Sequence, residues 1–259
     1  MRSKVRKLER LIRMHSPMLV AYSGGVDSTC LLAVARRTLG NFVLGVIADS
    51  PSLPRRALED ALAVANSLDA KVEVLATREL ERPEYFSNPL NRCYYCKAEL
   101  FARMNLLARE RGFSAIAYGE NADDPAHLRP GSRAAAEFAV LAPLKDAGLT
   151  KAEVRALSRA YGLPNADAPA QPCLASRIPY GTFVTREVLG LIERGEKAMR
   201  ALGFRVFRVR YLPGSGARVE VAPGEMPLLF EMRGRISQAL AEAGFLFMEV
   251  DARGYRSPK

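Results

Sequence analysis

The first two thirds of the chain alternate short β-branched or apolar runs with longer stretches of helical periodicity. The predicted strands lie at residues 18–22, 42–48, 71–75 and 116–119. The predicted helices between them lie at about 28–39, 54–68 and 94–111, after a basic amphipathic helix at the N-terminus. Strands that alternate with helices form parallel sheets through crossover connections. The pattern therefore predicts an α/β fold with a doubly wound parallel sheet, similar to a Rossmann fold.

The pattern changes after a Pro-rich stretch at residues 164–179. Before it, Thr150-Lys-Ala-Glu153 forms a capping box and predicts a helix that ends at Gly162. After it, we expect two helices, at 185–202 and 225–243, and three strands, two around the turn at 213–216 and one at 245–251. The sequence thus predicts two domains, residues 1–165 and a smaller α+β domain at 166–259. Residues 82–92 and 120–133 are predicted loops.

Composition narrows the class of protein. The 259 residues hold 38 Lys and Arg against 28 Asp and Glu, a formal charge of +10, and only four cysteines, too few for a disulfide scaffold. No apolar run approaches the roughly 18 residues that span a bilayer, and the N-terminus lacks the apolar segment of a signal peptide. We therefore expect a cytoplasmic protein without a membrane-spanning segment. The charge suits nucleic acid, an anionic membrane surface or phosphorylated ligands.

A glycine-rich turn, Ser23-Gly-Gly-Val-Asp-Ser28, joins the first predicted strand of the sheet to its helix. Backbone N–H groups in such a turn, and the positive end of the helix dipole, bind phosphate. The turn has neither the Gly-Lys-Ser/Thr of a Walker A loop nor the glycine spacing of a dinucleotide site. Two hydroxyls and the Asp27 carboxylate suit a pyrophosphate leaving group with Mg²⁺, and hence nucleotidyl transfer. The alternative is a plain capped turn.

This turn resembles the SGGxDS signature of the PP-loop ATP pyrophosphatases, which use ATP to adenylate an oxygen and release pyrophosphate. The resemblance implies that the turn residues bind ATP, with Asp27 and Ser28 as catalytic residues. It also implies that Asp49 and Ser50, after the second strand, hold the adenosine. The residues implied in ATP binding are Ser23, Gly24, Gly25, Asp27, Ser28, Asp49 and Ser50.

Further segments along nearly the whole chain resemble the LarE family of ATP-dependent sulfur transferases. These segments are residues 88–97, 118–124, 129–131, 172–177, 179–181, 208–210 and 254–257. The resemblance implies that ATP adenylates a carboxylate of pyridinium-3,5-biscarboxylic acid mononucleotide, and that sulfur then displaces AMP, in the biosynthesis of the nickel-pincer nucleotide cofactor. It also implies a homo-oligomer.

The resemblance assigns roles in the predicted second domain. Cys173 is the catalytic, sulfur-handling cysteine, and Arg208 and Arg210 bind the substrate phosphate. The residues that line the same site are Ser176, Arg177 and Glu220. Another acidic residue is expected shortly after Glu220, and Glu225 is only a weak candidate for it.

Elementary chemistry agrees with this assignment. A carboxylate becomes electrophilic only when its oxygen is made a good leaving group, and a thiolate or sulfide is then the natural attacker. Arg208 and Arg210 alternate along a predicted strand, so both side chains lie on one face, as a phosphate clamp requires. The alternative is a solvated basic edge strand.

Three of the cysteines suit a [4Fe–4S] cluster with one open iron that carries sulfide. Cys93 and Cys96 form a Cys-x-x-Cys pair, and Cys173 would join them through folding. The alternatives are a structural zinc with His127, cysteines without metal, and the other branch of the family, in which a lone cysteine gives up its sulfur and becomes dehydroalanine. Cys30 is expected to pack in the core.

Two other functions remain open at this point. A PP-loop tRNA thiolase would explain the charge and the three cysteines, but the basic residues are spread over both predicted domains, which disfavours nucleic acid. A nucleotide-binding protein without catalysis would leave the cysteines and the arginine strand unexplained. Asp123 and Asp124 are candidates for Mg²⁺ or substrate, or simply for a turn. The sequence does not identify the sulfide donor.

Overall fold

A computed structural model describes residues 1–124 and 130–255 of the chain. Contacts divide the chain into two compact units, and each is described by itself. The first consists of Met1–Glu79 and Asn91–Gln171, and the second of Leu80–Leu90 and Pro172–Lys259. The second unit therefore takes an eleven-residue segment from the middle of the first. The domain limits 1–165 and 166–259 stay a prediction.

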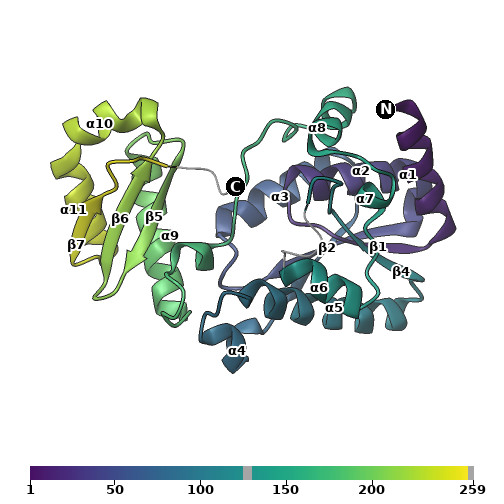
Figure 1. Ribbon diagram of the computed structural model, residues 1–259, viewed down its shortest axis with the longest axis horizontal. Helices are drawn as coiled ribbons and strands as arrows, with labels where there is room; N and C mark the ends of the chain where they lie inside the picture. Colours follow the sequence, from purple (N-terminus) through teal and green to yellow (C-terminus); the bar gives the residue numbers. More distant parts are fainter. Residues whose placement is uncertain (125–129, 256–259) are drawn as a thin grey trace. The chain divides into compact units, whose positions relative to one another are not determined.

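The first unit is built on a sheet of four parallel strands in the order β3-β2-β1-β4 (Figure 1). Its strands are β1 (Met18–Ala21), β2 (Val43–Asp49), β3 (Val72–Ala76) and β4 (Ala115–Tyr118). Its α-helices are α1 (Arg2–Met14), α2 (Val26–Leu39), α3 (Arg55–Ser67), α5 (Arg92–Arg111), α6 (Pro130–Glu137), α7 (Pro143–Asp146) and α8 (Lys151–Ala160). The predicted α/β fold with a parallel sheet is confirmed.

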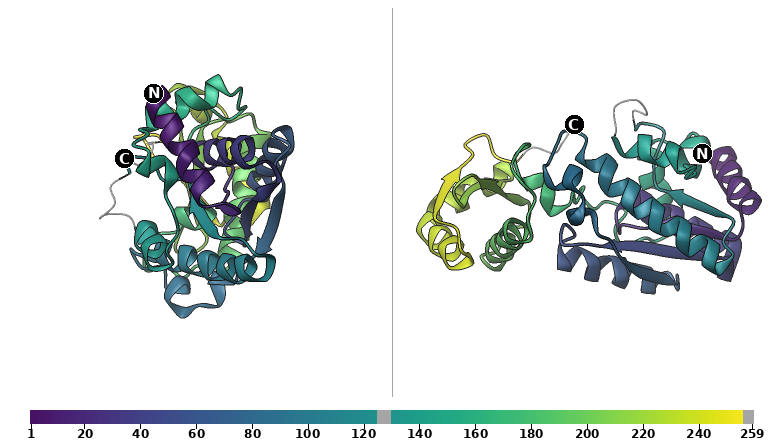
Figure 2. Two further views of the ribbon diagram at one scale, coloured as in Figure 1. Left: turned by 90° about the vertical axis from the view of Figure 1, so that its right-hand side faces the viewer. Right: turned by 90° about the horizontal axis from the view of Figure 1, so that it is seen from below.

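Successive residues of β1 point into two different cores. Met18 and Val20 pack with apolar side chains of α1, α2, α3, α7 and α8 on one face of the sheet. Leu19 and Ala21 pack with those of α5 and α6 on the other face. Figure 2 shows helices of this unit on both sides of its sheet. Both faces are buried, so the strand is apolar at every position. The carboxyl ends of these strands are where an open α/β sheet binds ligands.

The second unit is a small α+β structure. Its three strands, β5 (Phe207–Leu212), β6 (Gly216–Val221) and β7 (Phe247–Val250), pair in that order, antiparallel and then parallel. Its apolar core joins side chains of these strands to those of α9 (Arg186–Ala201), α10 (Met226–Glu231) and α11 (Arg233–Ala243). The unit also contains the short helix α4 (Pro83–Phe86) and a 3-10 turn, η3 (Leu174–Arg177).

Three details differ from the sequence predictions. The predicted loop at 82–92 contains the short helix α4, and α6 begins inside the predicted loop at 120–133. The single helix predicted at 225–243 is two helices separated by Met232, and Gly234, a weak helix former, lies in the first turn of the second helix. Within the described ranges, no helix is long and apolar enough to cross a membrane.

Candidate functional site

The glycine-rich turn follows β1 and leads directly into α2. Gly24 has φ +73°, and a Cβ there would lie 2.7 Å from the Cβ of Ala61 on α3, so only glycine fits. The Ser23 backbone N–H donates to the Ser28 hydroxyl oxygen at 3.1 Å, and the Ser28 hydroxyl donates to the Gly25 carbonyl at 3.0 Å. These bonds close the turn around the N-terminus of α2.

The end of β4 comes very close to this turn. A Cβ on Gly119 would lie 2.6 Å from the backbone N of Ser28, so a side chain there would displace the start of α2. Between the two segments lies a pocket of about 100 Å³. The residues that line it are Ala21, Ser23, Gly25, Asp27, Ser28, Lys97, Tyr118 and Gly119. The structure thus brings four of the predicted ATP residues to one pocket at a helix N-terminus, where phosphate binds.

Asp27 carries the negative charge of this pocket. Its Oδ2 accepts from the Lys151 ammonium at 2.6 Å, while its Oδ1 is buried and has no hydrogen-bond partner among the described residues. An unpartnered buried carboxylate oxygen is costly, and it is the kind of oxygen ligand that Mg²⁺ takes beside phosphates. The residues here therefore fit a bound Mg²⁺.

Two lysines and an asparagine at this site were not predicted. Lys97 lines the pocket from α5, and Lys151 reaches Asp27 from the first turn of α8. The Asn165 amide donates to the Gly24 carbonyl at 2.7 Å and to the Thr29 hydroxyl at 2.8 Å. Asn165 thereby ties the glycine turn to the stretch predicted only as a domain boundary. No local pattern distinguishes these three side chains from surface residues.

Tyr118 belongs to a buried polar network beside the pocket. Its hydroxyl donates to Glu120, which also accepts from Ser132 at 2.7 Å and lies 3.3 Å from Lys145. Burial, and then Glu120, raise the pKa of Tyr118. Burial alone would raise the pKa of Glu120, but the hydrogen bonds from Ser132 and Tyr118 and the charge of Lys145 lower it. The network holds an ionised carboxylate and a neutral phenol at this edge of the sheet.

Asp49 and Ser50 lie at the carboxyl end of β2, the strand next to β1. Asp49 pairs with Arg55 at 2.6 Å, and the Ser50 hydroxyl oxygen accepts from the Ser52 backbone N–H at 3.1 Å. They are not among the residues that line the phosphate pocket. Their role in holding adenosine stays a prediction. Of the two candidates in the loop after β4, Asp123 accepts from the backbone N–H of Lys151 at 2.8 Å and so anchors α8, and Asp124 accepts from the backbone N–H of Asn121 at 3.2 Å.

In the second unit, Arg177 organises the turn that carries Cys173. Its guanidinium is buried, pairs with Glu196 at 2.9 Å and donates to the carbonyls of Pro172 at 2.5 Å and Cys173 at 2.9 Å. The Ser176 hydroxyl also donates to the Cys173 carbonyl, at 2.7 Å. Both side chains therefore hold the backbone on either side of the cysteine.

Arg208 and Arg210 both lie on β5, two residues apart, as predicted for one face of a strand. Arg210 pairs with Glu220 on β6 and donates to the Ser176 carbonyl at 3.1 Å. Arg208 lies over the Tyr255 ring, 4.8 Å from its centroid. Burial, and then the charge of Arg177, lower the pKa of Arg208. The structure thus gathers the predicted substrate residues within one unit.

The four cysteines differ in their surroundings. Cys30 is fully buried, and burial raises the pKa of its thiol to about 11, so it is an unreactive core residue. Cys93 and Cys96 are three residues apart on α5 of the first unit, with Cys93 exposed. Cys173 precedes η3 in the second unit. Among the described residues, no group of three or more His, Cys, Asp and Glu side chains could hold a metal ion.

Glu225 and His127 were the remaining candidates for the substrate site and for a zinc site. The Glu225 carboxylate accepts from the backbone N–H groups of Arg205 at 2.9 Å and Val206 at 3.1 Å, which gives it a structural role in the approach to β5. His127, the possible zinc ligand, lies outside the described residues.

Known proteins resemble this chain over most of its length. The family model of NAD synthase matches residues 5–173. The chain is 40% identical to an uncharacterized protein of Synechocystis over 99% of its own length and 96% of the relative's. It is 32% identical to the pyridinium-3,5-bisthiocarboxylic acid mononucleotide synthase of Lactiplantibacillus plantarum, over 92% of this chain and 86% of that one. An uncharacterized protein of Methanocaldococcus jannaschii is 26% identical over 93% of the chain.

Proposed function

Because this chain belongs to the LarE family of PP-loop enzymes, which use ATP, we propose that it adenylates a carboxylate of pyridinium-3,5-biscarboxylic acid mononucleotide and replaces AMP with sulfur. The observation that carries the proposal is the phosphate pocket at the start of α2, whose lining includes Asp27, a residue with an unpartnered carboxylate oxygen. A product with two thiocarboxylates, as in the name of the L. plantarum relative, needs this reaction at each carboxylate.

In the first step, the substrate carboxylate oxygen attacks the α-phosphorus of ATP, a P–O bond breaks and pyrophosphate leaves. The turn N–H groups and Lys97 would bind the departing phosphates, and Asp27 would hold Mg²⁺. The ion would neutralise charge on the leaving pyrophosphate. In the second step, a sulfur nucleophile forms the C–S bond as the C–O bond to AMP breaks. Neither step oxidises or reduces carbon.

The second unit would supply the substrate and sulfur residues. Arg208 and Arg210 would hold the substrate phosphate, with Glu220 fixing the guanidinium of Arg210. Ser176 and Arg177 hold the backbone around Cys173, which would keep its thiol in place for transfer.

We further propose that the cluster-dependent route supplies the sulfur. Cys93 and Cys96 lie on one side of α5, because residues three apart on a helix are neighbours, and this fits two thiolate ligands. Cys173 would be the third. A [4Fe–4S] cluster with an open iron would hold transferable sulfide, so that Cys173 would not be consumed.

The proposed function is tested by adding ATP, the biscarboxylate mononucleotide and sulfide to the purified protein and measuring pyrophosphate and AMP. We expect both products, and we expect Asp27→Asn to abolish them while leaving the melting temperature close to that of the wild type. Glu59→Gln, at an exposed position on α3, is the matched control and should be fully active. Activity with tRNA alone would contradict the proposal and favour a tRNA thiolase.

The sulfur route is tested by anaerobic reconstitution with iron and sulfide. We expect broad absorbance near about 400 nm, as in other cysteine-ligated clusters, which Cys96→Ala should remove and Cys30→Ala should leave unchanged. Absorbance that survives in Cys96→Ala, or the loss of one H₂S from Cys173 after a single turnover, would contradict the cluster and favour the sacrificial route.

A further inference from the structure

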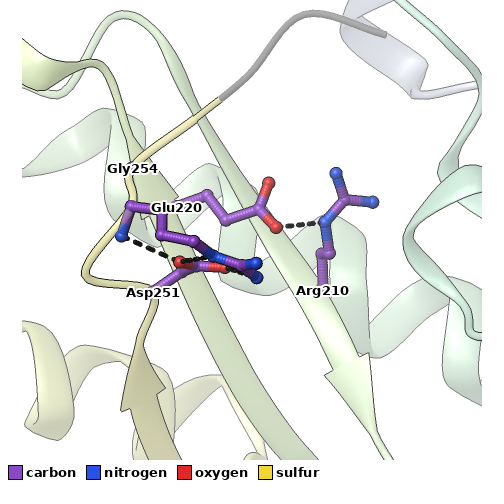
Figure 3. A pocket seen from close by; sticks show the side chains of 5 residues that line it. Arg210, Glu220, Asp251 and Gly254 are labelled. Carbon is purple, nitrogen blue, oxygen red and sulfur yellow. Dashed lines mark hydrogen bonds and ion pairs between the residues drawn. The ribbon is translucent and has the colours of Figure 1, made fainter.

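A second pocket lies in the second unit, at the face of β5 and β6. It measures about 180 Å³ and is lined by side chains of both signs (Figure 3). Its lining residues are Arg210, Glu220, Asp251, Arg253 and Gly254. The last three belong to the turn that follows β7, and no role is predicted for them from the sequence. This turn is therefore a candidate part of the substrate site.

Within the turn, Arg253 pairs with Asp251, and 70% of the Arg253 side chain is exposed. Its Nε and backbone N–H donate to Asp251 Oδ1 at 3.2 and 2.9 Å, and its Nη2 donates to Oδ2 at 3.2 Å. Across the pocket, the Nε of Arg210 donates to Glu220 and its Nη1 to the Ser176 carbonyl. Each guanidinium has five N–H groups, so N–H groups of both arginines remain for a ligand.

The backbone of the turn is also fixed to the sheet. The Asp251 N–H donates to the Val219 carbonyl at 3.0 Å, and the Tyr255 N–H to the Val221 carbonyl at 2.7 Å. The Gly254 N–H closes the turn on the Asp251 carbonyl at 2.9 Å. The charged groups of the pocket are thus preorganised, which lowers the entropic cost of binding.

The balance of charge indicates what the pocket binds. The two guanidinium groups and two carboxylates of the pocket sum to no net charge. A neutral pocket attracts a phosphate dianion only weakly. A pyridinium ring with carboxylates carries both signs itself. Its carboxylate can accept from a guanidinium, while its ring cation is attracted to the carboxylates of the pocket. A ring of this kind is therefore a better match than a phosphate.

We propose that this pocket binds the zwitterionic pyridinium ring, with Arg253 holding the carboxyl group that is not reacting and Asp251 facing the ring cation. The proposal rests on the proposed function and adds the residues that select a ring with two carboxylates. Arg208, which does not line the pocket, would then bind the substrate phosphate, and Arg210, which does line it, would contact the ring carboxylate rather than the phosphate. Arg253 is then a specificity-determining residue.

The test measures binding to the full-length protein by calorimetry, without ATP. The two probes are pyridinium-3,5-biscarboxylic acid mononucleotide and nicotinic acid mononucleotide, which has the same ring cation and phosphate but one carboxylate. We expect Arg253→Met to lower the affinity for the biscarboxylate about tenfold or more, because a charge-assisted hydrogen bond is lost. The affinity for the monocarboxylate should fall by less than about threefold. Arg235→Met, on the exposed side of α11, is the matched control and should change neither.

Asp251→Asn provides a second test. It should weaken binding of both probes, because both carry the ring cation, and binding of the biscarboxylate more strongly, because Asp251 also holds Arg253. Melting temperatures establish that each variant is folded. Equal weakening of both probes by Arg253→Met, or tighter binding by Asp251→Asn, would overturn the inference while leaving the proposed function in place. If the wild-type protein binds neither probe, the proposed function fails with it.

Discussion

Asp27 has two cations near it, and both come from distant parts of the chain. Lys151 bonds to it directly, across 124 positions of sequence, and Lys97 lines the same pocket. A phosphate site on this turn therefore depends on these lysines as well as on the backbone N–H groups of the turn. Since Lys151 already neutralises Asp27, Lys97 is the cation that the described lining of this pocket offers to the phosphates.

This leads to a prediction for Lys97. Lys97→Met should weaken binding of a non-hydrolysable ATP analogue by about tenfold or more, because a charge-assisted hydrogen bond to phosphate is lost. Isothermal titration with Mg²⁺ present measures the effect. Lys71→Met, at an exposed position before β3, removes the same charge elsewhere and should have little effect. Equal weakening by both variants would mean that Lys97 acts only through net charge.

At the scale of residues, the sequence predicted the turn but not its tertiary partners. Two glycines, two serines and an aspartate between a strand and a helix have a local physical meaning, and the structure places them as expected. Lys97, Lys151 and Asn165 have no such local signature, because folding alone brings them there. The same holds for Arg253 in the second unit.

At the scale of elements, α8 shows how a predicted cap positions a functional side chain. The Thr150 hydroxyl accepts from the Glu153 N–H, and the Glu153 carboxylate accepts from the Thr150 N–H, as the capping box predicts. Glu153 also pairs with Lys4 of α1 at 2.7 Å. The cap and this ion pair fix the first turn of α8, from which Lys151 reaches Asp27.

The cap predicts a specific dependence of stability on pH. The hydrogen bonds from Lys4 and then from the Thr150 backbone lower the pKa of Glu153 to about 2, from 4.5. A lowered folded-state pKa stabilises the protein above the unfolded pKa, and this contribution is lost as the pH falls from about 4.5 towards 2. The melting temperature of Glu153→Gln should therefore be lower than wild type at pH 6, and the difference should shrink on acidification. Glu59→Gln should show no such trend.

Most helices and strands followed from local signals, and the exceptions have physical reasons. Caps, glycine stops and β-branched runs predicted the elements of the parallel sheet. The short helix α4 is a single turn after Pro83, which is too short to show a helical period. The division between α10 and α11 falls at Met232, in a stretch whose apolar pattern continues across it.

At the scale of the whole molecule, the chain passes between its two units three times. Residues 80–90 leave the first unit, join the second and return. Their contacts explain this: Phe86 stacks on Phe183 with ring centroids 4.9 Å apart, and the Phe86 carbonyl accepts from the Val184 N–H at 2.9 Å. Contacts between segments distant in sequence leave no periodic pattern of apolar residues. The polar stretch at 82–92, which has two prolines, was therefore predicted as a loop. The segment is a structural part of the second unit.

Substitution of Asn88 tests whether residues 80–90 are a structural part of the second unit. Its side chain is fully buried, and its amide donates to the carbonyls of Pro179 at 2.8 Å and Thr182 at 2.9 Å, while its backbone has φ +55°. Asn88→Gly keeps the left-handed backbone but leaves these carbonyls without their donor, which should cost about 1–3 kcal/mol. Asn88→Ala should cost about 1 kcal/mol more, because alanine disfavours that conformation. Urea unfolding measures both, with the exposed Asn41→Ala as control.

Hydrogen exchange then locates the effect. If residues 80–90 belong to the second unit, Asn88→Gly should lower protection in peptides from residues 172–255 and leave those of β1 and β2 unchanged, because local stability follows the cooperative unit that lost the bond. Equal loss of protection in β1 would instead mean that the two units unfold as one. In that case a substitution in the pocket lined by Arg210 and Arg253 would also change the stability of the pocket at the start of α2.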